Sequence, residues 1–110
     1  MTITEFEKVY KNEELMKNNV IIDVRPEVHY GIVSLPSSVN LPLKIMERNP
    51  DEAKQICSKH DKVFVMCRRG NDSRLATELL INKCGVTNCV NVEGGIEQYS
   101  KEVDKKVPLY

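Results

Sequence analysis

Short apolar segments that alternate with helical segments restrict the fold of this chain more than any other feature. Four segments have the length of β-strands: residues 19–24, 39–41, 62–66 and 89–92. Three of these four are too apolar to leave one face in water, so they indicate a sheet that is covered on both sides. Three further segments have apolar residues at helical spacing: residues 5–16, 43–59 and 73–84. This alternation predicts an α/β domain with a mainly parallel sheet of about five strands and helices on both faces.

Local signals predict where some of the helices begin and end. Thr4 is a suitable N-cap for the first helix, with Glu7 completing a capping box. Asn49-Pro50 should break the second helix, because proline removes a backbone donor and clashes with the preceding turn. Gly85 should end the third helix as a left-handed cap.

Length and charge set limits on organisation and partners. The 110 residues are 41% hydrophobic, which suits a single domain spanning residues 1–110, and no repeat or linker interrupts them. Sixteen basic and sixteen acidic side chains balance, so no overall field favours nucleic acid or an anionic membrane. The N-terminal residues carry charges throughout and resemble neither a signal peptide nor a membrane span. We therefore expect a soluble, intracellular and cytoplasmic protein with no nucleic-acid or membrane partner.

The cysteines and histidines do not form a metal-binding pattern. Four cysteines and two histidines are present, with no Cys-x-x-Cys pair and no zinc-ligand spacing: Cys57, Cys67, Cys84, Cys89, His29 and His60. We expect no metal, no cofactor and no disulfide framework. Cys57, Cys84 and Cys89 fall in helices or at a strand start, where cysteine acts as a small hydrophobe. His29 has only a weak case as a ligand or a base.

Cys67 lies at the end of a buried strand and before a helix, where ligands bind in parallel α/β sheets. The intervening residues include Gly70 and Asn71, which tolerate left-handed backbone, so successive amides can turn inward as an anion cradle. The cradle, the helix dipole and three arginines should stabilise a Cys67 thiolate: Arg68, Arg69 and Arg74. The other interpretation is a strand-end cysteine that only packs, but packing does not explain so many arginines and turn formers around one thiol.

Several motifs in this chain resemble those of the rhodanese-like family. They are Asp23-Val24-Arg25, then Leu35-Pro36 and Val39-Asn40-Leu41-Pro42, the loop Cys67-Arg68-Arg69-Gly70-Asn71-Asp72, and Glu93-Gly94-Gly95 followed by Tyr99. Order and spacing agree over nearly the whole chain. The stretches DVRPEVHYGIVSLPSSVNLPL, CRRGNDS and the terminal PLY are most similar to the C-terminal rhodanese-like domain of the eukaryotic molybdopterin-synthase sulfurylases, which also activate a ubiquitin-related modifier. The family's usual GHI and GA are replaced by Val33-Ser34-Leu35 and Ser37-Ser38, which that subgroup also tolerates.

The resemblance implies a sulfurtransferase in which Cys67 carries sulfane sulfur as a persulfide. It implies a cysteine desulfurase as donor and, as acceptor, the adenylated C-terminal glycine of a ubiquitin-like sulfur carrier, which becomes a thiocarboxylate for tRNA thiolation or molybdopterin synthesis. We expect the inward amides of residues 68–73 to hold the terminal sulfur, with Arg68 and Arg69 receiving acidic parts of the partner. These are the candidate substrate-binding residues: Arg68, Arg69, Gly70, Asn71, Asp72 and Ser73.

The residues beside the loop have two interpretations each. Asp23 and Arg25 either brace the loop by a charge-assisted hydrogen bond or form a strand-end ion pair with no role in transfer. Asp72 adds a carboxylate that should repel thiosulfate and favour a protein-borne persulfide, so we expect weak thiosulfate activity. Asp72 or Ser73 is also a candidate N-cap for the following helix.

Two other functions remain open from the sequence. A dual-specificity protein phosphatase of this fold separates its cysteine and arginine by five residues, whereas Arg74 comes one residue late here. A catalytically silent rhodanese module used only for docking often lacks the cysteine, which this chain keeps. The sulfurylases place an adenylating domain before this one, so the chain is either an excised domain or a free-standing relative, and the sequence does not choose between them or fix the oligomeric state.

Overall fold

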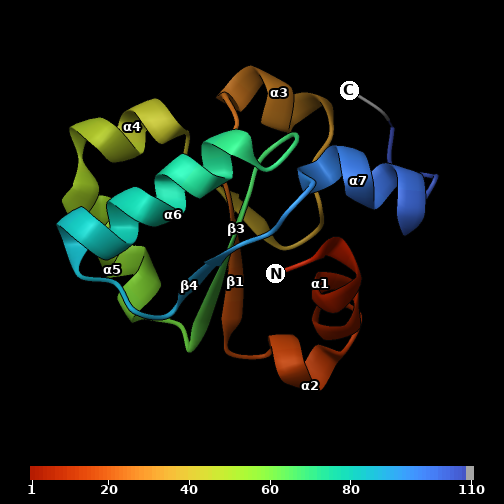
Figure 1. Ribbon diagram of the computed structural model, residues 1–110, viewed down its shortest axis with the longest axis horizontal. Coiled ribbons are helices and arrows are strands. Elements are labelled where there is room, and N and C mark those ends of the chain that lie inside the picture. The colour runs from red at the N-terminus through yellow and green to blue at the C-terminus, as the bar shows by residue number, and fades with distance from the viewer. Residues whose placement is uncertain (109–110) are drawn as a thin grey trace.

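The computed structural model describes residues 1–108 and places a parallel sheet between two layers of helices (Figure 1). The four strands are β1 (Asn19–Asp23), β2 (Ser38–Asn40), β3 (Lys62–Met66) and β4 (Cys89–Asn91), in the order β2-β1-β3-β4. Every pairing is parallel, which confirms the predicted α/β class. The expected number of about five strands is one too high for residues 1–108. Met1 contacts the end of β4 without forming a fifth strand: its amino group donates to the Asn91 carbonyl and its own carbonyl accepts from Glu93 N–H.

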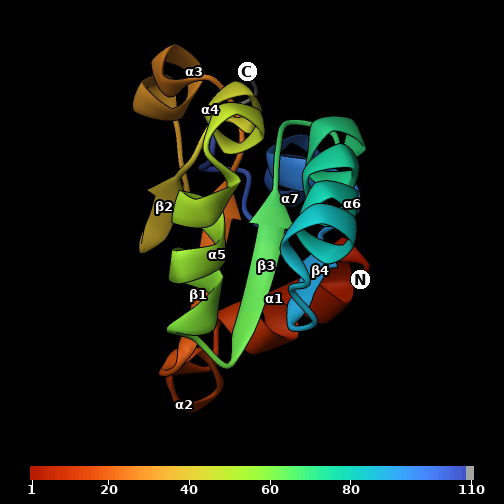
Figure 2. The ribbon, with the colours of Figure 1, turned by 90° about the vertical axis from the view of Figure 1, so that its left-hand side faces the viewer.

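Side chains of the central strands alternate between two separate cores. Val20 and Ile22 of β1 point into one core, while Ile21 points into the other. One core is covered by α4 (Leu43–Arg48), α5 (Pro50–Ser58) and α6 (Asn71–Cys84), and the other by α1 (Ile3–Tyr10) and α7 (Gly95–Glu102). The two groups of helices stand on opposite sides of the strands in Figures 1 and 2. Because helices cover both faces of the sheet, these strands carry apolar residues on both faces and do not alternate apolar with polar residues.

The N-terminal helical segment is divided, and its predicted cap is wrong. Thr2, not Thr4, caps α1: Glu5 N–H donates to the Thr2 hydroxyl oxygen at 3.2 Å and Thr2 N–H donates to the Glu5 carboxylate at 3.1 Å. The sequence offers two Thr-x-x-Glu boxes two residues apart. The earlier box is used because it places Ile3 and Phe6 inside the core. Asn12 then caps the short helix α2 (Glu13–Met16), so residues 5–16 are not one helix.

The other helix boundaries follow the predicted signals more closely. The segment 43–59 is broken at Asn49, and Pro50 opens α5 at its first position. Gly85 ends α6 with φ +68°, which confirms the left-handed cap. Two helices lie outside the predicted segments, namely α3 (Glu27–Ile32) and α7. Within residues 1–108, no helix is both long and apolar enough to cross a membrane. Leu109 and Tyr110 of the terminal PLY motif lie outside the described residues.

Candidate active site

The carboxyl ends of the two central strands bring the predicted site residues to one edge of the sheet. Asp23 at the end of β1 is in register with Met66 at the end of β3, so Cys67 follows directly beside Asp23. This confirms the prediction that Asp23 and Cys67 end neighbouring parallel strands at one edge. The loop after β3 then leads into α6, as Figure 2 shows.

The Cys67 sulfur lies at the N-terminus of α6 and is almost fully buried, with 3% of the residue exposed. Gly70 N–H donates to Cys67 Sγ at 3.0 Å, and Sγ lies 3.3 Å from Ser73 Oγ. Gly70 has φ +98°, and a Cβ there would lie 2.9 Å from the Gly94 nitrogen, so only glycine fits. The turn at Gly70 is therefore what directs an amide onto the sulfur, as the inward-cradle expectation requires.

The helix that follows the loop starts earlier than predicted. It begins at Asn71 and is capped by Gly70, without a side-chain cap bond. The expectation that Asp72 or Ser73 fills the N-cap is therefore wrong, because the left-handed glycine starts the helix before either residue. Asp72 is exposed in the first turn, where its charge complements the helix dipole. Ser73 is fully buried and contacts the sulfur rather than the open pocket.

The first turn of helix α7 holds the backbone of the loop. Ile96 N–H donates to the Cys67 carbonyl at 2.9 Å, and Glu97 N–H donates to the Arg68 carbonyl at 3.0 Å. In a trans peptide the carbonyl and the next N–H point in opposite directions. With both carbonyls directed at α7, the amides of Arg68 and Arg69 are directed away from it. The first turn of α7 thus fixes the peptide planes on which an anion cradle depends.

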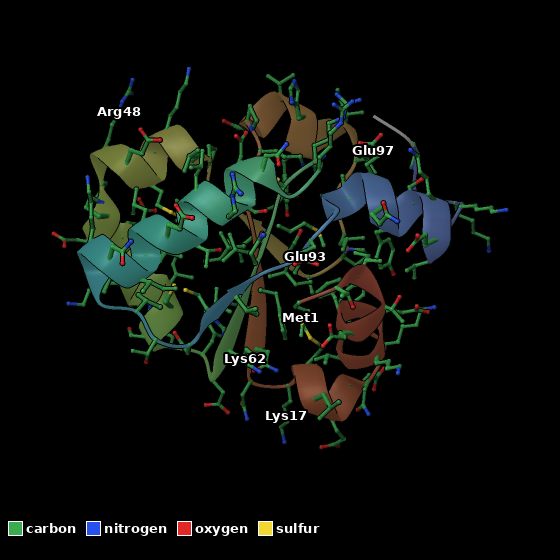
Figure 3. All side chains as sticks on the ribbon, in the orientation of Figure 1. Met1, Lys17, Arg48, Lys62, Glu93 and Glu97 are labelled. Atoms are coloured by element: carbon green, nitrogen blue, oxygen red, sulfur yellow. The ribbon has the colours of Figure 1, made fainter. Side chains whose placement is uncertain are left out.

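Close backbone contact and an ion pair complete this attachment. A Cβ on Gly95 would overlap the Cys67 carbonyl oxygen and lie 2.5 Å from the Arg68 carbonyl oxygen. Glu97 accepts a hydrogen bond from Arg69 Nε at 2.8 Å, and this pairing with Arg69 lowers the pKa of the Glu97 carboxyl. Glu97 lies in the first turn of α7 (Figure 3), at the end of the helix that meets the loop. Sequence reasoning did not predict these contacts, although the Gly94-Gly95 pair is a signal of close backbone approach.

Asp23 and Arg25 form a buried ion pair beside the loop. Their exposed fractions are 1% and 2%, and Arg25 Nη2 donates to the Asp23 carboxylate at 2.8 Å. Nη2 also donates to the Val33 carbonyl at 2.5 Å, so the pair ties the end of β1 to the segment after α3. Arg25 Nη1 is buried and has no hydrogen-bond partner in residues 1–108. The ion pair therefore fixes the end of β1, and it also places the Arg25 guanidinium in the wall of the pocket.

A pocket of about 310 Å³ opens beside Cys67. Its walls come from the end of β1, the start of α3, the loop and the first turn of α6: Arg25, Pro26, His29, Cys67, Arg68, Arg69, Asn71 and Asp72. Arg68, Arg69, Asn71 and Asp72 are exposed at its rim. Asp23, Gly70 and Ser73 are buried in or beside the loop and do not line the pocket. Arg74 is exposed on α6 and is not part of the wall either, so the structure does not bring it into the site.

The remaining cysteines differ from Cys67 in their surroundings. Burial raises the pKa of the Cys57 thiol to about 11 and also raises the pKa of Cys89. Cys84 is buried near the Pro50 carbonyl, and all four cysteines are free thiols. No set of three or more histidine, cysteine or acidic side chains in the described part of the chain is arranged to hold a metal ion.

The fold and the loop together define a rhodanese-like domain. The family described as "Rhodanese-like domain" matches residues 6–102, and the chain belongs to that family. Among curated relatives, the adenylyltransferase and sulfurtransferase UBA4 of Saccharomyces cerevisiae is 34% identical over 116 residues, covering 100% of this chain and 26% of that protein. UBA4 of Debaryomyces hansenii is 41% identical over 105 residues, covering 92% of this chain and 23% of that protein. The adenylyltransferase and sulfurtransferase MOCS3 of Oryza sativa is 38% identical over 101 residues, covering 84% of this chain and 22% of that protein.

These relatives agree with the similarity to the sulfurylase subgroup, and their names describe both adenylyl transfer and sulfur transfer. The chain spans about a quarter of their length. A solved rhodanese-related protein from Thermoplasma volcanium has a TM-score of 0.70 at 28% identity, covering 94% of this chain and 91% of that one. A Rhodopseudomonas palustris protein described as a possible tyrosine phosphatase has a TM-score of 0.77 at 21% identity, covering 99% and 82%, and shares the fold.

Proposed function

We propose that this protein is a rhodanese-type sulfurtransferase in which Cys67 carries sulfane sulfur as a persulfide. The observation that supports this most directly is the Gly70 N–H donated to Cys67 Sγ at the N-terminus of α6, beside a pocket lined by arginines. A thiolate in this position is stabilised by the amide and by the helix dipole. The same surroundings suit the anionic terminal sulfur of a persulfide.

The proposed donor is the persulfide of a protein such as a cysteine desulfurase. The Cys67 thiolate attacks the outer sulfur of that persulfide, a new S–S bond forms on Cys67, and the donor cysteine leaves as a thiolate. The negative charge of Asp72 at the pocket rim disfavours a dianion such as thiosulfate. A protein donor brings less charge to the reacting sulfur and gains contacts outside the loop.

The proposed acceptor is the adenylated C-terminal glycine of a ubiquitin-like protein. The terminal sulfur attacks the adenylated carbonyl, and AMP leaves. A thiolate then attacks Cys67 Sγ and breaks the S–S bond, which releases the thiocarboxylate and leaves a mixed disulfide on Cys67. A second thiol reduces this disulfide and regenerates the Cys67 thiol. In this proposal Arg68 and Arg69 at the rim receive the phosphate or acidic parts of this partner, and their place in the pocket wall supports the role. The thiocarboxylate would then supply tRNA thiolation, molybdopterin synthesis or both.

The site argues against the two other functions. A protein phosphatase needs an arginine directed into the phosphate cradle, and Arg74 is exposed outside the pocket wall. A docking module without catalysis does not need a thiol held by an inward amide.

Intact-mass measurement after incubation with a cysteine desulfurase and cysteine tests the proposal. We expect a gain of one sulfur atom that is lost on reduction, and we expect Cys67→Ala to abolish it. Cys57→Ala, Cys84→Ala and Cys89→Ala are the matched controls and should load normally, because their thiols lie outside the pocket. Loading that survives in folded Cys67→Ala, or that requires one of the other cysteines, would refute the assignment.

A further inference from the structure

Three side chains form a continuous hydrogen-bonded series behind the reactive sulfur. Cys67 Sγ lies 3.3 Å from Ser73 Oγ, and the Ser73 hydroxyl donates to Asn91 Oδ1 at 2.5 Å. Asn91 belongs to β4 and also donates its Nδ2 to the Gly70 carbonyl at 3.4 Å. Asn91 therefore contacts both the serine and the glycine that contact the sulfur.

The hydroxyl of Ser73 has one proton to donate and lone pairs to accept with. Because Asn91 uses its amide N–H toward Gly70, it presents its carbonyl oxygen to Ser73. The serine proton is then directed at Asn91, and only a lone pair faces Cys67. That arrangement suits a thiol, which can donate S–H to the serine oxygen. It does not suit a thiolate, which needs donors.

We propose that Ser73 is a hydroxyl switch and that Asn91 is the positioning residue that holds its proton away from Cys67. When Cys67 ionises, its proton leaves to solvent and the Ser73 hydroxyl turns from Asn91 to the sulfur. The thiolate then has two donors, the Ser73 hydroxyl and Gly70 N–H. Asn91 competes with the thiolate for one proton, so it sets how readily the resting thiol becomes the nucleophile.

In sulfur transfer, which rests on the function proposed above, this proton follows the charge on Sγ. During loading, the thiolate uses its electron pair to form the new S–S bond, so Sγ loses its charge and the hydroxyl returns to Asn91. When cyanide takes the outer sulfur, or when a thiol reduces the mixed disulfide that remains on Cys67 after release of the thiocarboxylate, the electron pair of the S–S bond returns to Sγ and the hydroxyl turns again. Ser73 therefore stabilises Cys67 both as nucleophile and as leaving group.

The test compares the rate of Cys67 alkylation by iodoacetamide at about pH 7 with the rate at about pH 10, followed on the Cys67 peptide by mass spectrometry. The ratio of the two rates reports the thiolate fraction and cancels differences in access. It requires no sulfur donor, so its outcome is independent of the persulfide experiment. The charged and titratable groups around the sulfur stay unchanged in the variants: Asp23, Arg25, His29, Arg68, Arg69, Asp72 and Glu97.

Ser73→Ala should lower the ratio about tenfold, because a hydrogen bond to a charged group is lost. Asn91→Ala should raise it several-fold, because the serine proton becomes free for the thiolate. In the Ser73→Ala background, Asn91→Ala should leave the ratio unchanged, since no hydroxyl remains to redirect. Asn88→Ala is the matched control: it removes a half-buried asparagine with two side-chain hydrogen bonds near β4 but outside the pocket wall, and should not change the ratio.

An Asn91→Ala effect of equal size with and without Ser73 would overturn the switch, as would a fall in the ratio for Asn91→Ala alone. If Ser73→Ala does not fold, Asn91→Leu alone still tests the proposal, because it fills the space and removes the acceptor. Asn91→Leu must then raise the ratio of the alkylation rate at about pH 7 to that at about pH 10, in protein that a cooperative thermal unfolding transition shows to be folded.

Discussion

Within the pocket, the sulfur of Cys67 and the carboxylate of Asp72 differ in exposure and in charge. The sulfur is buried and accepts a hydrogen bond from a backbone amide, whereas the carboxylate is exposed to solvent at the rim of the pocket. A small dianion must pass this carboxylate to reach the sulfur, while a protein donor can bind mainly outside the loop. Donor selectivity should therefore depend on this single side chain.

Asp72→Ala and Asp72→Asn should raise kcat/KM for thiosulfate:cyanide transfer about tenfold, since screening by solvent limits the repulsion to about 1–2 kcal/mol. Transfer from a desulfurase should gain much less. Steady-state kinetics with both donors measures the difference. Asp51→Ala is the matched control, because Asp51 is also an exposed first-turn acid but lies on α5 outside the pocket wall. Unchanged or slower thiosulfate turnover in folded Asp72 variants would leave Asp72 with only its interaction with the helix dipole.

Some site residues could be predicted from the sequence because their residue type is unusual at its position. Cys67 is a thiol between a buried strand and arginines, and Gly70 is a turn former before a helix. Asn91 carries no such signal, since a polar residue in a short strand is ordinary. Its contacts with Ser73 and Gly70 arise only when β4 is placed beside β3, so no local pattern reports them.

At the scale of elements, α7 does more for the loop than cover a core. Two of the free amides in its first turn, those of Ile96 and Glu97, donate to the carbonyls of Cys67 and Arg68, so helix and loop stabilise each other. The sequence did not predict α7, because two left-handed glycines at its start mimic a loop: Gly94 has φ +82° and Gly95 has φ +59°. Strand β3, by contrast, was predicted at its observed bounds, since four consecutive apolar residues admit few alternatives.

Gly95→Ala should reduce sulfur loading by more than tenfold, because the added Cβ pushes α7 away from the loop and releases the peptide planes. The rate of loading by a desulfurase, followed by intact mass, measures this effect. Gly85→Ala is the matched control: Gly85 also has a positive φ of +68°, but a Cβ there meets nothing within 4 Å. Both variants should lose stability through backbone strain, and only Gly95→Ala should lose loading. Equal loading rates in the two would contradict a positioning role for α7.

For the molecule as a whole, burial favours the neutral form of four ionisable side chains, namely Tyr10, Cys57, Cys89 and Tyr99, and the shifts are largest for Cys57 and Tyr10. Burial raises the pKa of Cys57 from 9.0 to about 11 and that of Tyr10 from 10.0 to about 12. The unfolded chain therefore releases these protons at lower pH than the folded protein does. Their contribution to stability is complete below about pH 9 and is lost as the pH rises through the folded values.

The free energy of unfolding should fall as the pH is raised from about 8 to about 11, by up to about 2 kcal/mol from Cys57 alone. Urea unfolding under reducing conditions at a series of pH values measures this decline. Cys57→Ala lowers stability at every pH by leaving a cavity, but its decline with pH should be shallower. Parallel curves for the two proteins would show that Cys57 does not titrate on unfolding.

The reactive centre takes its parts from almost the full length of the described chain. In sequence order, Asp23 and Arg25 come first, Cys67 and Ser73 follow, and Asn91, Ile96 and Glu97 come last. Every strand pair is parallel, so none of these parts can meet through a local hairpin. A chain that is still being synthesised therefore cannot assemble the surroundings of Cys67 until its residues near 97 have left the ribosome. The fold is completed and the site around the sulfur is assembled in the same event.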